Sequence, residues 1–398
     1  MSNKSEKAMA TNNNNKALNV PHLRFPEFTG EWEKCKVSDL LDFYSTNSLS
    51  WEQLEYDTNT VMNLHYGLIH VGLPTMVDLA KDKLPNIKKE NMPKNFELCK
   101  EGDVAFADAS EDTNEVAKTI EFYNLARENI VCGLHTIHGR DNKNKTVVGF
   151  KGYAFSSAAF HNQIRRIAQG TKIYSISTKN FSECYIGLPS KPEQTKIATL
   201  LRLIDERIST QNKIIEKLQS LIKGLAAQLT QSGTPNIRLC DCLECHSSTL
   251  QENCVSVTGS YPVYGATGLI GYTNNYAYNG ESILIVKDGS GVGSLSYVND
   301  HFSVIGTLDY LTAKENYSIL YLYYALMAFN FTPYITGMAI PHIYFKDYGK
   351  AKLFYPSIEK RIRIASLLHN IEQKLVVEQN LVISLSAQKS YLLRMLFI

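Results

Sequence analysis

The chain has 398 residues, of which 44% are hydrophobic, and this is enough material for more than one buried core. The formal net charge is only +2, which excludes a basic field over the whole molecule, so any binding of nucleic acid must use local patches. The 8 cysteines are scattered without the pattern of a small secreted scaffold and no apolar run has transmembrane length, so we expect a cytoplasmic protein with reduced thiols and no membrane contact.

Residues 1–20 are polar and lack an apolar segment, so they are expected to form a flexible arm and not a signal peptide. Residues 21–188 predict a first globular domain of short strands with few long helices. Its predicted elements are strands and a turn within 56–73, a short strand at 102–106, another strand at 130–137 and a helix at 153–168.

Residues 189–230 predict one long helix. Apolar residues recur along it at alternating steps of four and three, a period typical of a coiled coil because it keeps one helix face on a partner. Only Gln211 interrupts the row. A helix of roughly 55–60 Å is too long for an ordinary surface helix, which favours a strut. The expected pairing residues are Ile197, Leu201, Ile204, Ile208, Ile215 and Leu218.

Residues 231–235 predict a linker, and residues 235–355 a second globular domain. Its beginning, IRLCDCLECHSS, can be laid on KVSDLLDFYSTN of the first domain, with Leu239 on Val37. A strand is predicted at 282–286 and a helix at 318–330, whereas residues 259–280 are rich in Gly, Tyr and Asn and are expected to be loops. The two domains are therefore expected to share their edges and to differ in their middles.

Residues 356–398 repeat the long helix 167 positions later without a gap. Even the polar break recurs, since Glu378 stands where Gln211 does, and the match begins upstream, where Gly337 answers Gly170. The apolar end, LLRMLFI, is expected to dock on a partner or on the body of the protein. The pairing residues expected here are Ile364, Leu368, Ile371, Leu375, Val382 and Leu385.

These elements predict an α+β fold: two mixed α/β domains, separated by two long helices that pair as an antiparallel coiled coil, with a pseudo-two-fold internal repeat. The alternative is a coiled-coil scaffold without DNA specificity, in which equivalent helices of two chains pair in parallel. Glu378 would then face a second Glu378 in the seam, and this like-charge pair disfavours the scaffold.

Cys242-Leu-Glu-Cys245-His246 has the C-x-x-C-H spacing of covalent haem attachment, and Cys240 beside it makes zinc conceivable. The corresponding positions of the first domain hold neither cysteine nor histidine, so these cysteines are interpreted as small residues of a packed element. The other histidines lack a metal-ligand spacing, and no nucleophile or amino-methyltransferase string occurs. We therefore assign no catalytic, cofactor-binding or metal-binding residue.

Two loops that follow predicted strands are candidates for ligand contact. Gly289-Ser-Gly291-Val-Gly293 lacks both dinucleotide and P-loop spacing, and a phosphate-approaching loop and an ordinary turn are equally compatible with it. Asp108 and Asp288 each follow a strand and have a serine two residues on. Such side chains can accept from a cytosine amino group or contact phosphate, although each is also typical of an Asx turn. Their recurrence in both copies favours a shared, ligand-facing loop.

Aromatic, amide and basic side chains near these loops complete the candidates for DNA contact. In the first domain the set is His65, Tyr66, Lys88, Lys89, Asp108, Ser110 and His135. In the second domain it is Tyr264, Tyr272, Asn274, Asn275, Lys287, Asp288 and Ser290. Most lysines of residues 77–100 alternate with acids and are interpreted as a solvated face.

The doubled arrangement and several sequence blocks resemble the specificity (S) subunit of type I restriction–modification systems. The blocks are Leu23-Arg24-Phe25-Pro26 with Trp32, the run from Tyr261 to Tyr272, Ile283 to Ser290, and Gly337-Met-Ala-Ile-Pro-His-Ile with Tyr355-Pro356-Ser357. The resemblance covers nearly everything after residue 20. The first domain departs from the pattern, because Tyr174-Ser-Ile replaces a proline-containing turn.

This resemblance implies a non-catalytic reader of double-stranded DNA. Residues 21–188 and 235–355 would be target recognition domains that each read half of a split target, and the helices over 189–230 and 356–398 would hold them at a fixed distance. Two methyltransferase (M) subunits would dock on the helices, and two restriction (R) subunits would translocate and cleave DNA. S-adenosylmethionine, ATP and Mg²⁺ would be bound by these partners and not by this chain.

Overall fold

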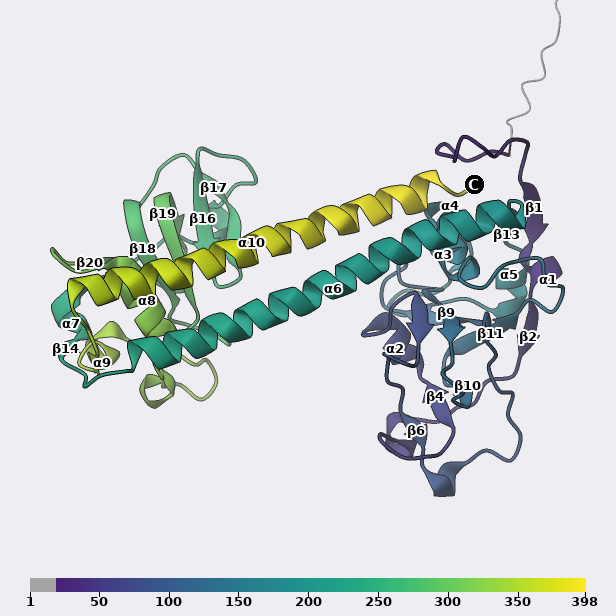
Figure 1. The fold of residues 1–398 in the computed structure, drawn as a ribbon, viewed down its shortest axis with the longest axis horizontal. Helices are drawn as coiled ribbons and strands as arrows, with labels where there is room; N and C mark the ends of the chain where they lie inside the picture. The colour runs from purple at the N-terminus through teal and green to yellow at the C-terminus, as the bar shows by residue number, and fades with distance from the viewer. Residues whose placement is uncertain (1–18) are drawn as a thin grey trace, which may run out of the picture. The chain divides into compact units, whose positions relative to one another are not determined.

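The computed structural model describes residues 19–398, so almost all of the predicted N-terminal arm lies outside the described residues. The chain divides into two compact units (Figure 1). Unit 1 comprises the chain up to Thr210 together with Val382–Ile398, and unit 2 comprises Gln211–Leu381. The boundary therefore falls inside both long helices, and each globular part includes pieces of both.

Unit 1 is built on a five-stranded sheet in the order β2-β11-β7-β9-β5, which is antiparallel except for the pair β5–β9. A second sheet has the order β10-β4-β6-β3. The strands are β1 (Glu33–Lys36), β2 (Asp42–Tyr44), β3 (Leu54–Glu55), β4 (Met62–Leu64), β5 (Met76–Asp78), β6 (Asn86–Ile87), β7 (Val104–Ala107), β8 (Ala109–Ser110), β9 (Thr119–Asn124), β10 (Ile130–Cys132), β11 (Thr136–Arg140), β12 (Tyr174–Ser175) and β13 (Tyr185–Leu188).

The short helices of unit 1 are α1 (Val37–Leu40), η1 (Trp51–Gln53), α2 (Tyr66–His70), η2 (Lys89–Asn91), α3 (Lys151–Phe155), α4 (Ala158–Ile167) and α5 (Thr178–Ser182). Three predictions for unit 1 are corrected by the structure. The expected turn within 56–73 is helix α2, because the His65 ring accepts a hydrogen bond from the Gly67 backbone N–H and caps the helix. The expected helix at 153–168 is divided, since Ser157 ends one turn and caps α4. The expected strand at 130–137 is two strands, β10 and β11.

Unit 2 has one six-stranded sheet in the order β15-β20-β18-β19-β16-β17. Residues 259–280, which we expected to be loops, largely form the hairpin β16–β17, with a register shift at Val263/Tyr264. The elements are β14 (Ile237–Arg238), α7 (Leu239–Cys242), β15 (Leu243–Ser247), η3 (Glu252–Cys254), β16 (Tyr261–Gly265), β17 (Gly268–Thr273), β18 (Tyr278–Val286), β19 (Leu295–Val304), β20 (Leu308–Ala313), α8 (Ile319–Met327), η4 (Thr332–Tyr334), α9 (Phe345–Tyr348) and β21 (Lys352–Leu353).

The two units contain the same central sheet. β2, β11, β7, β9 and β5 correspond in order and direction to β15, β20, β18, β19 and β16, including the one parallel pair at β5–β9 and β16–β19. The expectation that the domains differ in their middles is therefore wrong for the sheet. They differ in additions, which are the second sheet of unit 1 and β17 of unit 2, and in strand length, since β18 has 9 residues and β7 has 4.

The frame around the sheet also repeats. A turn closes over 169–175 in unit 1 and over 336–342 in unit 2, and we call this pair the glycine turns. Gly170 and Gly337 occupy them with φ of 142° and 89°, a region that favours glycine. Their positions differ by the 167 residues of the sequence repeat, as do the starts of α5 and α9. α1 and α7 likewise match in the register predicted from Val37 and Leu239.

Two long helices, α6 (Lys191–Thr230) and α10 (Ile358–Met395), contribute to both units. In unit 1 the start of α6 packs on the end of α10: Leu201 and Leu392 share one core, and Lys389 lies 2.6 Å from Asp205. In unit 2 the end of α6 packs on the start of α10, where Ala226 and Leu368 share a core. The two helices therefore run antiparallel in each unit.

The residues predicted to pair the helices are all buried or half-buried, and the polar breaks are buried with them: Gln211 is 2% exposed and Glu378 5%. Glu378 forms an ion pair with Lys374 one turn earlier. The apolar end of the chain docks on the body of the protein, because Leu396 and Phe397 lie in the core of unit 1. None of the helices in residues 19–398 combines the length and apolarity that a membrane crossing requires.

Candidate nucleic-acid interface

A pocket of about 700 Å³ opens in unit 1 where β7 ends. α2, the loop after β7 and the glycine turn surround it, and its lining includes Tyr66, His70, Ser110, His135 and Ile173. Three of these five residues are predicted contacts.

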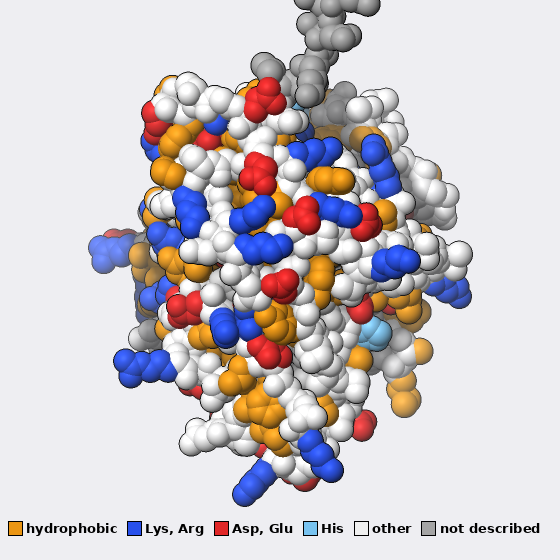
Figure 2. Space-filling model, turned by 90° about the vertical axis from the view of Figure 1, so that its right-hand side faces the viewer, with side chains coloured by type: hydrophobic (Ala, Val, Ile, Leu, Met, Phe, Trp, Pro, Cys, Tyr) orange, Lys and Arg blue, Asp and Glu red, His pale blue; other side chains and the backbone are white. Residues whose placement is uncertain are grey.

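The face in Figure 2 carries Lys and Arg mixed with Asp and Glu, so a site on this face would rely on local groups and not on a broad field.

Asp108 and His135 are held together beside this pocket. The Asp108 backbone N–H donates to the His135 carbonyl at 3.1 Å, and His135 Nδ1 lies 3.2 Å from Asp108 Oδ1. His135 has a φ of 54°, a conformation that non-glycine residues seldom adopt and that is concentrated at functional sites. Burial raises the pKa of the Asp108 carboxyl, and His135 opposes that shift. The pair presents an acceptor and a half-exposed imidazole at one place.

An aromatic row leads to this pair. The ring of Trp51 lies 4.4 Å from that of His65, His65 lies 4.7 Å from Tyr66, and Tyr66 lies 5.3 Å from His135. His65 Nδ1 accepts from the Gly67 N–H at 3.1 Å, which places the proton of the neutral ring on Nε2. Burial, followed by the influence of His135, lowers the pKa of His65 and favours this neutral form.

The two lysine candidates of unit 1 lie apart from the pocket lining. Lys88 Nζ donates to the Glu52 carbonyl at 2.6 Å, which ties it to η1 beside Trp51. Lys89 is exposed at the start of η2. Of the two, Lys89 therefore has the more solvated charge, as is expected of a phosphate contact.

The loop after β18 corrects the equivalence assumed for the two aspartates. β7 ends at Ala107 and β18 at Val286, and the equivalent residues Ile176 and Ile343 donate to the carbonyls of Asp108 and Lys287. Lys287 is thus the counterpart of Asp108, and Asp288 lies one residue further on. A shift of one residue reverses the side-chain direction in extended chain, so the recurrence of aspartate does not mark a shared position.

Lys287 forms an ion pair within unit 2. Its Nζ lies 2.8 Å from Asp309 Oδ1, and the same carboxylate accepts from Ser247 at 2.7 Å. The backbone of Asp288 pairs with that of His342 in the glycine turn as an isolated antiparallel β-bridge, and Ser290 is exposed. The amides of residues 289, 292, 293 and 294 all donate to backbone carbonyls, as expected of a strand-connecting turn.

The remaining candidates of unit 2 lie at the hairpin. Tyr264 and Tyr272 belong to β16 and β17 and are half-buried, while Asn274 and Asn275 are exposed directly after β17. β19 separates this hairpin from β18 in the sheet, so the structure places the candidates of unit 2 in two groups. Next to the asparagines, Tyr261, Tyr276 and His301 form an aromatic cluster with ring centroids 4.6–5.5 Å apart, and sequence reasoning missed that these three rings converge.

Sequence reasoning also missed two exposed isoleucines. Ile173 and Ile340 hold equivalent places in the glycine turns and are 62% and 65% exposed. Met338 beside Ile340 is fully exposed. A large apolar side chain in solvent at the same position of both copies is a signal for binding that the repeat contained, since both residues stood in the matched segment.

The C-x-x-C-H string is a packed element. Cys242 is fully buried at the end of α7, and burial raises the pKa of its thiol to about 12. Cys245 and His246 are neighbours on β15 and bind separate partners, Asp309 and Thr312. The string therefore does not converge on one metal position.

Residues 82–220 and 237–385 both match the model of the type I restriction modification DNA specificity domain. The chain therefore belongs to this family of type I restriction–modification specificity subunits.

The chain is similar to the type I restriction enzyme EcoprrI specificity subunit of Escherichia coli, with 28% identity over 112 residues, which is 28% of each chain. It is 25% identical over 220 residues to the putative MjaX specificity subunit of Methanocaldococcus jannaschii, which covers 55% of this chain and 50% of that one. These matches span half or less of the curated relatives.

Solved structures give the fold. The S subunit of a type I system from M. genitalium superposes with a TM-score of 0.64 at 18% identity, over 95% of this chain and 99% of the other. A chain solved in work on assembly and conformational transition of the type I R-M system gives a TM-score of 0.53 at 15% identity, over 91% and 96%.

Proposed function

We propose that this chain reads DNA sequence for a type I restriction–modification complex, with each unit reading one half of a bipartite target. The observation that supports this most strongly is the doubled sheet with unlike side chains at the same edge. Unit 1 presents Asp108 and His135 there, whereas unit 2 has Lys287 bound to Asp309. One frame with two sets of hydrogen-bonding groups fits two half-sites of different sequence.

In this proposal the reading surfaces combine polar loops with the glycine turns. Asp108, His135 and Tyr66 would contact base edges in one half-site, and the loop 288–290 together with Asn274 would do so in the other. Ile173 and Ile340 would supply apolar contact, as to a thymine methyl group. Lys88 and Lys89 would contact phosphates, and of these Lys89 is the better placed because its charge is solvated.

The chain itself would be non-catalytic. Two methyltransferase subunits would dock on α6 and α10, two restriction subunits would join them, and S-adenosylmethionine, ATP and Mg²⁺ would be held by these partners. Exposed aliphatic side chains on the long helices support docking. They are Leu203 and Leu221 on α6 and Ile358, Ile362, Leu367, Val376, Val377 and Ile383 on α10.

A scaffold function is less well supported. In each unit the apolar seam of one long helix is covered by the other helix of the same chain. A second chain that paired along this seam would have to displace it.

The direct test is an exchange of residues 240–336 for the corresponding segment of a family member with a different target, in cells that supply the methyltransferase subunits. Sequencing of methylated sites should show one changed half-site and one unchanged half-site. Changes in both halves would contradict independent reading. The isolated chain, incubated with duplex DNA and labelled S-adenosylmethionine, should transfer no methyl group.

A further inference from the structure

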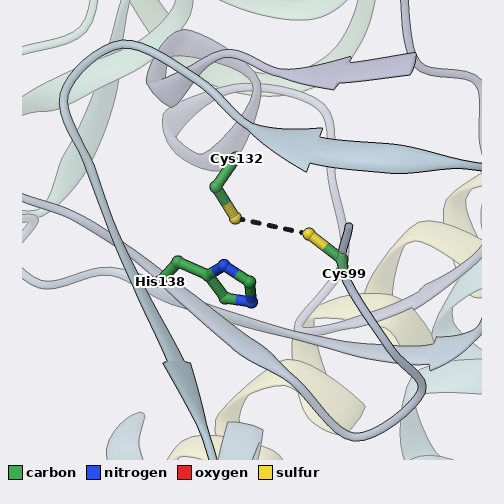
Figure 3. Close-up of side chains that lie close together, drawn as sticks. All are labelled: Cys99, Cys132 and His138. Carbon is green, nitrogen blue, oxygen red and sulfur yellow. Dashed lines mark hydrogen bonds between the residues drawn. The ribbon is translucent and has the colours of Figure 1, made fainter. Parts of the chain in front are cut away.

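Cys99, Cys132 and His138 converge inside unit 1 (Figure 3). Cys99 precedes β7, Cys132 ends β10 and His138 lies in β11, so three separate segments contribute. All three residues are buried, at 5%, 1% and 0% exposure. One ligand atom of each lies within 4.8 Å of the others, and the two sulfur atoms are 3.6 Å apart.

The His138 ring is fixed in place by a buried carboxylate. Its Nε2 lies 2.7 Å from Asp103 Oδ2, and Arg140 fixes that carboxylate with donors at 2.8–3.1 Å. When the imidazole is neutral and its Nε2–H donates to this carboxylate, Nδ1 keeps a lone pair, which is the arrangement seen when a carboxylate supports a metal-bound histidine.

The Nδ1 atom of His138 is buried and has no hydrogen-bond partner among residues 19–398. Figure 3 shows one ring nitrogen on the side of the Cys132 sulfur. A buried ring nitrogen without a partner, next to two thiols, is an atom that a metal ion can satisfy.

The separation of the sulfurs suits a shared ion. Two thiolates at about 2.3 Å from a tetrahedral zinc are about 3.8 Å apart, close to the 3.6 Å between Cys99 and Cys132. Two thiolates and a neutral imidazole are the soft-to-borderline donors that Zn²⁺ prefers, and two thiolates balance its charge.

The fold does not require this cluster. In the equivalent sheet of unit 2, Ser282 stands at the position of Asp103, Tyr310 at that of His138 and Thr312 at that of Arg140. The shared frame is thus built without the charged network, and the network is specific to unit 1.

We propose that Cys99, Cys132 and His138 bind one Zn²⁺ ion, with each thiol releasing its proton to solvent. The fourth ligand is a water molecule from the adjacent cavity of about 500 Å³, whose lining includes Cys132, Asn47 and Glu97. The ion ties the segment before β7 to β10 and β11. Because His138 follows His135 by three residues in the same stretch of chain, the ion stiffens the base of the loop that carries His135. The inference does not depend on DNA reading by this chain.

The test measures metal content of the full chain, purified with a reductant from zinc-supplemented cells. We expect about one zinc ion per chain in the wild type. The zinc content per chain should fall approximately tenfold or more in C99S, C132S and H138Q. C184S is the matched control, because Cys184 is also a buried thiol of unit 1 at 5% exposure. C242S controls for the C-x-x-C-H string. Both should retain the metal.

A second readout uses the wild type alone, in case the variants fail to fold. Zinc removal by a chelator followed by Co²⁺ should give the thiolate-to-cobalt charge-transfer absorption of a tetrahedral site. The absence of both zinc and this absorption in reduced, folded protein would overturn the proposal. So would a Cys99–Cys132 disulfide in protein isolated without a reductant, or loss of metal from C242S alone.

Discussion

Gly170 and Gly337 determine whether the glycine turns can form. A Cβ at either position would collide with a backbone carbonyl oxygen, that of Ile173 in unit 1 and that of Ile340 in unit 2. Both residues also have positive φ, which L side chains rarely adopt. These turns carry the exposed isoleucines, so the same backbone constraint sets the place of an apolar group in each unit.

We predict that G170A and G337A each lower the free energy of unfolding of their own unit by about 1–3 kcal/mol. Both tryptophans, Trp32 and Trp51, lie in unit 1, so their fluorescence in urea follows unit 1, whereas far-ultraviolet circular dichroism follows both units. G170A should shift the fluorescence transition and G337A should not. G224A, in open space on α6, is the control and should stabilise by up to about 1 kcal/mol.

We predict that H135A impairs the recognition of one half-site only and thereby weakens methylation of the target sites. If the imidazole contacts a base, its loss should cost about 1–3 kcal/mol of discrimination and relax the sequence at one position of that half-site. Methylated-site sequencing with the methyltransferase subunits measures this. Cys184, buried away from the pocket, supplies the control C184S. Relaxation in both half-sites, or in neither with unchanged affinity, would show that His135 does not read a base.

The candidate site was only partly accessible from the sequence. Tyr66, Ser110 and His135 are far apart in the chain, and a pattern could nominate each but not bring them to one pocket. The assignment of Asp108 and Asp288 to one position failed because a one-residue offset is invisible where both loops contain short polar residues. Cys99, Cys132 and His138 have no motif spacing, so only the packing of three segments reveals them.

The long helices were the elements that the sequence defined best. The predicted ranges 189–230 and 356–398 compare with observed helices over Lys191–Thr230 and Ile358–Met395, because a seven-residue apolar period is a strong local signal. The central sheet was harder. Its strands have unequal lengths in the two units, and in extended chain register depends on partners distant in sequence. The β16–β17 hairpin was missed because its Gly and Tyr content is also that of loops.

We predict that L201A and L368A, which truncate equivalent seam residues with 0% exposure, each cost about 2–5 kcal/mol. Leu201 lies in the core of unit 1 and Leu368 in that of unit 2, so only L201A should shift the tryptophan transition in urea. L203A, on the same helix at 53% exposure, should change stability by less than about 0.5 kcal/mol. Equal effects of L201A and L203A would show that the predicted stripe does not stabilise unit 1.

At the scale of the whole molecule, both connections between the units are helical, since the boundary falls at 210/211 in α6 and 381/382 in α10. If these helices measure the distance between half-sites, four residues inserted at both boundaries should add roughly 6 Å. With a rise of about 3.4 Å per base pair, the spacer between the half-sites should then lengthen by one or two base pairs.

The insertion at both boundaries should leave the half-site sequences unchanged, which methylated-site sequencing will show. An insertion in α6 alone is the control: it rotates one stripe by about 40° beyond a full turn and should lower stability without a defined new spacer. An unchanged spacer in an active complex with both insertions would exclude the helices as the ruler.

Unit 1 is interrupted in the chain and completed by Val382–Ile398. The Leu23 N–H donates to the Met395 carbonyl at 2.9 Å, and Phe397 packs against Trp32. During synthesis on the ribosome, the whole of unit 2 is therefore made before the strip that closes unit 1. The usual N-terminal-first order of co-translational folding should be reversed here. The core of unit 1 should stay incomplete until unit 2 has been synthesised and residues Val382–Ile398 have followed it. Nascent chains arrested after residue 381 should resist protease over unit 2 and remain sensitive over unit 1.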